Sequence, residues 1–341
     1  VLMWQAAWTQ GFQTSRRPEM MANALAWLAI LSSAFAEDSP PPERVASFLV
    51  IGDWGYDRVA HGSLVPDCQQ KIADQMHQEF LALGDVKFVV NVGDSFYPSG
   101  VSSREDQQWH TKWRGVYSSD VRSVPWYSVY GNHDMLIDKG ACTHDEEEAA
   151  QINHNSEDLD HFYMPGFSWF LEHADLDLEV LALDLNELWV DHTCRHTSCE
   201  ADCRTTVKER AEAALELFYQ RMENSNASNL LVFSHYPTDY LSDLPDMIGN
   251  LTNGTRPGGL PRHIEYFGGH RHNVDQDSTL SIYPNNNWLV GGGGGWSCDG
   301  NAQGFLVGEI LSDGSIVTRP VLANYCSCCP CGYWWWLPGH R

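Results

Sequence analysis

The sequence has little positive charge and few long apolar runs. Its 341 residues include 21 lysines and arginines against 45 aspartates and glutamates, so the net charge is −24. This acidity argues against a nucleic-acid or anionic-membrane partner, because both attract basic surfaces. The apolar stretch at residues 21–36 is too short to span a bilayer. The sequence therefore predicts a protein with no transmembrane segment and no nucleic-acid partner.

The stretch at residues 21–36 has the features of a signal-peptide core. It ends in Ala34-Phe-Ala36, a typical cleavage pattern, and Arg16 and Arg17 form a positive flank before it. Alternatively, Met20 or Met21 is the true start and residues 1–20 are a gene-model extension, or the stretch is a buried N-terminal helix. We expect a signal-peptide region at 1–36 and a protein that is secreted, extracellular or held in a lysosome- or vacuole-like compartment.

The ten cysteines favour an oxidising compartment. Seven of them fall in two clusters, at positions 194–203 and 326–331, and the sequence does not determine their pairing. The spacings fit no standard zinc finger, which favours disulfides over zinc. Glycosylation motifs at Asn226, Asn250 and Asn253 are also consistent with secretion.

A valine-rich run at residues 88–92 ends abruptly in Gly93-Asp94. This pattern is typical of a buried strand that ends in a loop. In α/β sheets, ligands bind just beyond the carboxyl ends of the strands. Asp94 is therefore expected at a functional site.

The same pattern recurs after four other apolar runs, at residues 47–51, 126–130, 230–233 and 264–267. The five polar turns together supply seven candidate metal ligands: Asp53, Asp94, Tyr97, Asn132, His235, His270 and His272. Oxygen donors mixed with imidazoles suit first-row metals, and seven ligands are too many for one ion. The sequence therefore predicts two metal ions that share a bridging ligand.

The five turns resemble the motifs of the calcineurin-like metallophosphoesterases and, within them, the purple acid phosphatases of the small, tartrate-resistant type. The motifs are Asp53-Trp-Gly55, Gly93-Asp-Ser-Phe-Tyr97, Gly131-Asn-His-Asp134, Val232-Phe-Ser-His235 and Gly269-His-Arg-His272. Gly55 stands where most superfamily members have a histidine, and Tyr97 is the substitute ligand. The resemblance covers about residues 48–295 and implies an α/β fold, a four-layer α-β-β-α metallophosphoesterase sandwich.

The resemblance also implies how the ligands divide between the two ions. In this family one metal is Fe(III), and here Asp53, Asp94, Tyr97 and His272 would bind it. The other is Fe(II), Zn(II) or Mn(II), and Asp94, Asn132, His235 and His270 would bind it. A phenolate is a hard anionic donor that suits a trivalent ion, whereas the second set is more neutral. The two ions would also offset the acidity of the chain toward anionic phosphate.

The implied activity is that of a monomeric acid phosphatase acting on phosphate monoesters, either small esters or phosphoproteins. Hydroxide activated by the two metals would attack phosphorus without a covalent intermediate. His133 is the candidate for protonating the leaving group, although a histidine here also suits a structural hydrogen bond. Asn132, His133 and Arg271 are candidate substrate contacts. The alternatives are a phosphodiesterase or pyrophosphatase of the same fold, or a non-enzymatic secreted metal- or phosphate-binding protein.

One departure from the family concerns a second histidine that does not bind metal. The small enzymes carry it in the loop after Val-x-x-His, and residues 236–244 contain none. Asp239, Asp243 or His263 are candidates to replace it.

The remaining pattern predicts the scaffold. Helices are expected at residues 68–83 and 205–222, and a hairpin at 305–321. Trp109, Trp113 and Tyr117 are expected to pack a helix onto the sheet. Residues 138–161 are expected to form a surface loop, and 237–261 a loop over the site. The glycines at 291–295 either cradle phosphate or form a tight turn beneath the metals.

The motifs span most of the chain, which favours one catalytic domain at residues 37–325. The tail at 326–341 is rich in cysteine and tryptophan and has no assigned role. It is either an interfacial anchor or a non-native read-through.

Overall fold

The computed structural model describes residues 40–55, 68–143, 145–197, 199–295, 302–324 and Cys328. The expected signal-peptide region at 1–36 lies outside this set, as does the tail apart from Cys328. No helix among the described residues is long and apolar enough to cross a membrane.

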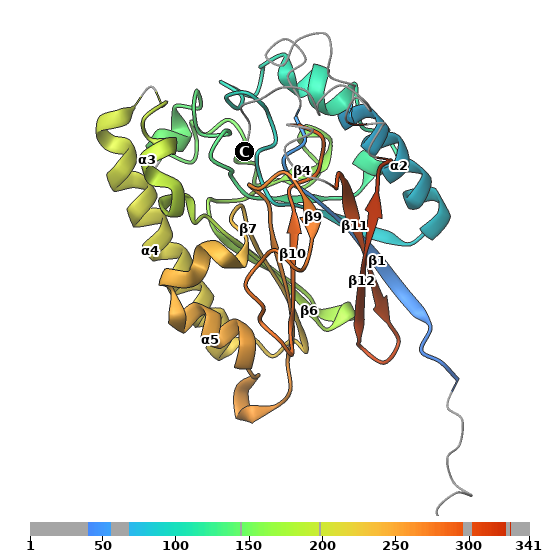
Figure 1. The fold of residues 1–341 in the computed structure, drawn as a ribbon. Helices are drawn as coiled ribbons and strands as arrows, with labels where there is room; N and C mark the ends of the chain where they lie inside the picture. The colour runs from blue at the N-terminus through green and yellow to red at the C-terminus, as the bar shows by residue number, and fades with distance from the viewer. Residues whose placement is uncertain are drawn as a thin grey trace, which may run out of the picture. The chain divides into compact units, whose positions relative to one another are not determined.

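Two six-stranded mixed sheets form the centre of the fold, as Figure 1 shows. The first has the order β12-β11-β1-β2-β3-β4 and the second the order β5-β6-β7-β8-β10-β9. The strands of the first sheet are β1 Arg44–Ile51, β2 Val86–Asn91, β3 Trp126–Ser128, β4 Phe162–Tyr163, β11 Gly304–Leu311 and β12 Ile316–Leu322. Those of the second are β5 Trp169–His173, β6 Leu178–Leu183, β7 Asn229–Ser234, β8 His263–Gly268, β9 Val274–Asp275 and β10 Asn286–Val290.

The central strands of both sheets are parallel and almost completely buried. In the first sheet β1, β2, β3 and β4 pair in parallel, and in the second β6, β7, β8 and β10 do. Continuous apolar runs of this kind form strands that are covered on both faces. Phe48 of β1 stacks on Phe88 of β2 at 5.3 Å and meets Phe267 of β8 at 6.3 Å, so the two sheets pack face to face.

Helices cover the outer faces and complete the four layers (Figure 1). Helix α2 (Cys68–Leu83) packs against the first sheet, and α4 (Glu200–Asn224) and α5 (Pro245–Asn253) lie over the second. The four-layer α-β-β-α sandwich expected from the motifs is confirmed. The short helical turns are η1 Trp109–Arg114, η2 Val121–Ser123, η3 Gly140–Cys142, η4 Leu159–His161, η5 Ala174–Leu176, η6 Asn186–Trp189, α3 Val190–Thr193, η7 Thr238–Asp243 and η8 Pro257–Gly259.

The aromatic residues in and just after η1 are Trp109, Trp113 and Tyr117, and they belong to the core, as expected. Trp113 contacts Trp54, the residue after Asp53, with ring centroids 5.6 Å apart, and it contacts Trp126 of β3 at 4.3 Å. Trp109 and Tyr117 are 1% exposed. Because Trp54 lies inside this cluster, the packing fixes the turn that carries Asp53.

The expected helices and the hairpin are confirmed, with α4 starting earlier and ending later than expected. Two loop expectations are wrong. Residues 237–261 include α5, whose Met247 and Leu251 are fully buried. Residues 138–161 are not a solvated surface throughout, because Asp138 is buried and accepts hydrogen bonds from Tyr130 Oη and the Ala150 amide.

Three disulfides are present, which confirms the preference for disulfides at the described cysteines. They join Cys68 to Cys328, Cys142 to Cys199 and Cys194 to Cys203. The other four cysteines, at positions 298, 326, 329 and 331, lie outside the described residues.

Candidate metal centre

The seven expected ligands meet at one edge of the molecule. Each follows the carboxyl end of a parallel strand, as expected for ligand sites in α/β folds: Asp53 follows β1, Asp94 and Tyr97 follow β2, Asn132 follows β3, His235 follows β7, and His270 and His272 follow β8. Asp53, Asp94 and His270 have positive φ angles of 56°, 49° and 69°. Left-handed backbone at non-glycine residues is unfavourable and concentrates at functional sites, where the surrounding structure enforces it.

The first group of ligands surrounds the phenolic oxygen of Tyr97. This oxygen is 2.9 Å from Asp53 Oδ1, 2.9 Å from Asp94 Oδ2 and 3.2 Å from His272 Nε2. His272 Nε2 is in turn 3.6 Å from Asp53 Oδ1. Tyr97 and Asp53 are fully buried and Asp94 is nearly so. Two carboxylates, one phenol and one imidazole therefore point at the same small volume.

The second group surrounds the side-chain oxygen of Asn132. This oxygen is 3.1 Å from His235 Nε2 and 2.8 Å from His270 Nδ1. His235 Nε2 is also 3.3 Å from Asp94 Oδ2, the atom that contacts Tyr97 in the first group. Asp94 therefore belongs to both groups, which is the position that a bridging ligand requires.

The hydrogen bonds of His235 show that these residues fit a cation. Its Nδ1 lies 3.0 Å from the Val92 carbonyl, which only accepts, so Nδ1 carries a proton. Its Nε2 then faces two oxygens, Asn132 Oδ1 and Asp94 Oδ2. Either a second proton or a metal ion must lie between them. Metal-binding histidines commonly donate the other ring N–H to a backbone carbonyl in this way.

The pKa values of the site residues without metal also indicate that the site fits a cation. Burial raises the pKa of Asp53 to about 6. Burial opposes charge on Asp94 also, but the imidazoles of His235 and His133 outweigh it and hold the pKa of Asp94 below its usual range. Burial likewise opposes charge on His235, but Asp94 raises the pKa of His235 to about 9. A metal must displace this proton, so metal binding competes with acid.

Two glycines are required by the close approach of the site loops. A Cβ at Gly55 would lie 1.9 Å from the Ser95 carbonyl oxygen, so no side chain fits at this position. A Cβ at Gly131 would lie 2.1 Å from Asp94 Oδ1. The absence of a side chain at Gly55 lets the loop that carries Tyr97 close over Asp53, and the Tyr97 amide donates to the Gly55 carbonyl at 2.7 Å.

The glycine run at 291–295 forms a tight turn beneath the site. The amides of Gly293 and Gly295 donate to the carbonyls of Gly52 and Asp53 at 2.9 and 2.7 Å. A Cβ at Gly295 would lie 2.6 Å from the Tyr97 ring. These contacts favour a tight turn that supports Asp53 and Tyr97 over a phosphate cradle.

His133 lies at the rim of the cluster. Its amide donates to Asp94 Oδ1 at 2.8 Å, and its ring lies 4.6 Å from that of Tyr97. Its Nδ1 is 2.7 Å from the Pro98 carbonyl and therefore carries a proton. The hydrogen bond fixes the orientation of the ring.

Asp134 holds two site loops together. It is fully buried, and its oxygens accept from the amides of Ser95, Phe96 and Gly131 at 2.9 to 3.2 Å. Burial, together with the Asp94 charge, raises the pKa of Asp134 to about 7. The contacts make Asp134 a residue that fixes the turns carrying Asp94 and Asn132.

We expect Asp134→Ala to lower the free energy of unfolding by about 2 kcal/mol, because buried amides lose their acceptor. Urea unfolding measures this. Asp145→Ala is the matched control, since Asp145 also accepts from two amides, Glu147 and Glu148, but is exposed to water that can replace it. Equal losses in the two variants would contradict the role given to Asp134.

Three residues were the candidates to replace the absent second histidine: Asp239, Asp243 and His263. Asp239 lies 3.4 Å from Arg271, and Arg271 also donates to Ser278. Asp243 is exposed. The suggestion that His263 reaches the site is wrong: it is the first residue of β8, at the end away from the metal ligands, and it contacts Glu265 at 2.8 Å.

The sequence did not reveal that Trp189 and Tyr240 border His270, or that His192 lies beside Trp189. The rings of Trp189 and Tyr240 lie 5.3 and 5.1 Å from that of His270, and the ring of His192 is 6.1 Å from that of Trp189. Burial and the neighbouring charges of His196 and His133 lower the pKa of His192. The sequence did contain a signal for this region. Asp184-Leu-Asn186 is another polar strand end, after β6, and it leads into the η6 turn that carries Trp189.

The comparison with known families agrees with the geometry. A sequence model of the calcineurin-like phosphoesterases matches residues 46–274, which include all seven ligands. The chain belongs to the calcineurin-like phosphoesterase family. Membership implies a two-metal centre, and the ligand atoms of Asp53, Asp94 and His235 lie within 4.8 Å of one another.

Among curated proteins, the chain is similar to purple acid phosphatases. It is 36% identical to purple acid phosphatase 4 of Arabidopsis thaliana over 105 residues, which are 31% of this chain and 29% of that protein. It is 30% identical to human tartrate-resistant acid phosphatase type 5 over 119 residues, 35% of each chain. The aligned segments thus span about a third of these relatives.

A solved structure shares the fold of this chain. It is described as GAP50, the anchor in the inner membrane complex of Plasmodium, and it aligns with a TM-score of 0.56 and 19% identity. The alignment covers 82% of this chain and 85% of the other. At this identity the likeness concerns the fold alone.

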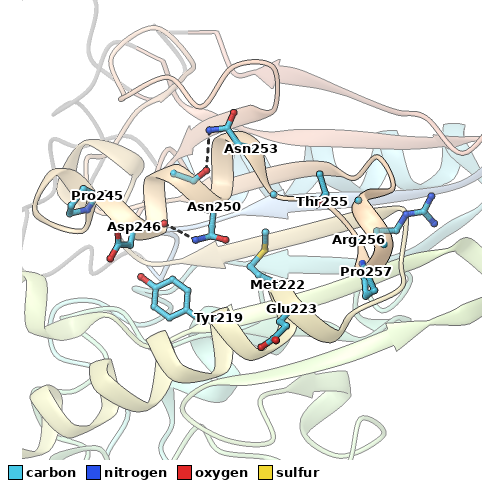
Figure 2. Close-up of a pocket in the computed structure, with 14 residues that line it drawn as sticks. Tyr219, Met222, Glu223, Pro245, Asp246, Asn250, Asn253, Thr255, Arg256 and Pro257 are labelled. Carbon is cyan, nitrogen blue, oxygen red and sulfur yellow. Dashed lines mark hydrogen bonds between the residues drawn. The ribbon is translucent and has the colours of Figure 1, made fainter.

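A large groove lies apart from the candidate metal centre. Its volume is about 720 Å³, and Figure 2 shows it between α4, α5 and the loop at 254–259. Arg256 in this groove donates to the carbonyl of Asn226, just before β7 begins. The groove is therefore at the amino ends of the strands, opposite the metal ligands.

Proposed function

We propose that this protein is an acid phosphatase that hydrolyses phosphate monoesters, small or on proteins, with two bound metal ions. The observation that carries the proposal is the pair of ligand groups that share Asp94, with the Tyr97 phenol in only one of them. The phenol and the two carboxylates suit Fe(III), bound by Asp53, Asp94, Tyr97 and His272. The amide and imidazoles suit Fe(II), Zn(II) or Mn(II), bound by Asp94, Asn132, His235 and His270.

When bound, two metal ions polarise the phosphoryl oxygens and lower the pKa of water, so that a nucleophile exists at acid pH. The chain supplies the rest. His133 Nε2, oriented by the bond from Nδ1 to Pro98, is the group proposed to protonate the departing alcohol. Asn132 and Arg271 are proposed to contact the phosphate. The His133 amide and Asp134 hold these loops in place before substrate binds.

We also propose that the protein is a secreted or lysosome- or vacuole-like monomer with the domain limits expected from the sequence. Three disulfides support an oxidising compartment. The glycosylation motifs fit this proposal as well, since Asn226 and Asn253 are exposed and Asn250 is partly exposed.

A visible spectrum of the purified protein, with metal analysis, tests the ferric assignment. We expect a broad visible absorption band from tyrosine-to-iron charge transfer and about two metals per chain. The band should vanish in Tyr97→Phe. Tyr236→Phe is the matched control, because that buried tyrosine adjoins His235 at 5.2 Å but bonds to Asn186, outside the ligand set.

The other outcomes are equally informative. A colourless protein that holds two divalent metals would contradict the ferric site and favour a phosphodiesterase or pyrophosphatase of the same fold. Loss of the band in Tyr236→Phe as well would remove Tyr97 as its source. A protein with metals but no turnover of any phosphate ester would overturn the proposed activity.

A further inference from the structure

We infer that Trp189 and Tyr240 bind the aromatic group of aryl phosphate esters whose phosphate lies at the metal centre. The inference rests on the proposed phosphatase activity and names a preferred substrate class for the same site. The ligand chemistry is a planar ring joined directly to the phosphate oxygen. We call Trp189 and Tyr240 together the aromatic shelf.

The aromatic shelf lies next to the candidate ligand His270. The ring of Trp189 lies 5.3 Å from that of His270 and 5.9 Å from that of Tyr240, and Tyr240 lies 5.1 Å from His270. His270 itself contacts Asn132 and His235 through Nδ1. The shelf therefore begins one side chain away from the ligand cluster, within reach of a ring attached to a bound phosphate.

Trp189 is partly exposed to solvent. Its side chain is 39% exposed, whereas every other tryptophan in the described ranges is 7% exposed or less. Aromatic faces prefer offset or edge-to-face contacts with other rings, and an exposed indole at the rim offers such a face.

Hydrogen bonds and a disulfide hold the segment that carries Trp189 in place. Asn186, at the start of the same η6 turn, donates to Asp184 and to the Tyr130 carbonyl and accepts from Tyr236. The turn continues into α3, which leads to Cys194, and the Cys194–Cys203 disulfide ties this segment to α4. A ring held in place before binding loses little freedom when the ligand arrives, which favours affinity.

Direct binding of two non-hydrolysable probes tests the inference without depending on leaving-group chemistry. Calorimetry compares phenylphosphonate with methylphosphonate on the full, metal-loaded protein, wild type and Trp189→Leu. We expect wild type to prefer the phenyl probe by about three- to tenfold, the range that one aromatic contact supplies. In Trp189→Leu this preference should disappear, while the methyl probe keeps its Kd within about twofold.

Tyr219→Leu is the matched control. Tyr219 is a similarly exposed aromatic residue, 36% exposed, but it lines the groove at the opposite end of the molecule (Figure 2). Its replacement should leave the preference for phenylphosphonate unchanged. Tyr240→Leu is a second shelf variant and should lower the preference even if Trp189→Leu fails to fold. Metal content is measured in every variant.

The outcomes separate the two proposals. If both probes bind and both shelf variants keep the wild-type preference, the shelf is wrong and the phosphatase proposal stands. If the shelf variants weaken both probes equally, the rings only support His270, and the inference is again wrong. If neither probe binds the metal-loaded wild type, the proposed function fails and the inference fails with it.

Discussion

Asp94→Asn is expected to lower kcat/KM by about a thousandfold, since loss of about 4 kcal/mol of electrostatic stabilisation has that effect. Asp94 Oδ2 is the atom that both ligand groups share, 2.9 Å from Tyr97 Oη and 3.3 Å from His235 Nε2. Asparagine keeps the oxygen that accepts from the His133 amide, so the loop retains that contact. It replaces the shared, charged oxygen by an N–H donor, so both ion sites are weakened.

Metal analysis and phosphatase kinetics on the same preparation measure this result. We expect fewer than about two metals per chain together with the loss of turnover. Asp85→Asn is the matched control: Asp85 directly precedes β2, whereas Asp94 follows that strand, and it pairs with Arg44 at 2.8 Å. A variant Asp94→Asn that kept two metals and full turnover would rule out the bridging role.

Gly55→Ala is expected to lower the free energy of unfolding by about 3 kcal/mol, the upper range for an overpacked site. The added Cβ would lie 1.9 Å from the Ser95 oxygen and 2.7 Å from Phe96 Cα, and both are backbone atoms that a rotamer change does not move. The loop from Asp94 to Tyr97 must shift away from Asp53. Metal content should therefore fall along with stability.

Denaturant unfolding and metal analysis measure these losses of stability and metal content. Gly249→Ala is the matched control, because Gly249 has space around it. Gly249 lies within α5, and no atom lies within 4 Å of a Cβ placed there. Gly249→Ala should leave metal content unchanged and raise stability by about 0.5 to 1 kcal/mol, the usual gain from alanine in a helix. If Gly55→Ala proved as stable as Gly249→Ala, the close approach of the two loops would be refuted.

The convergence of the seven candidate ligands could be predicted from the sequence because one physical rule places them. The carboxyl ends of parallel strands meet at one edge of a sheet, so polar residues after five apolar runs converge whatever the chain does in between. The apolar spacing of Ile72 and Met76 likewise predicted α2, since both face the core. These features depend on local periodicity, which is readable from the chain alone.

Other features depended on contacts that local patterns do not encode. The segment 237–261 is rich in glycine, proline and asparagine, yet Met247 and Leu251 bury against neighbouring core residues and stabilise α5. Similarly, the acidic stretch after Asp138 predicted exposure, but tertiary hydrogen bonds bury that carboxylate. Trp189 was missed because it follows a strand, β6, whose end carries none of the proposed metal ligands.

The division of the site between the two sheets has a consequence for biosynthesis. Asp53 and His270 are 217 positions apart, yet the His270 amide donates to Asp53 Oδ2 at 3.0 Å. Chains emerge from the ribosome amino end first. A nascent chain therefore presents two carboxylates and a phenol well before His235, His270 and His272 have been translated. The complete set of candidate ligands exists only once residue 272 has been translated, so the proposed two-ion site forms late in synthesis.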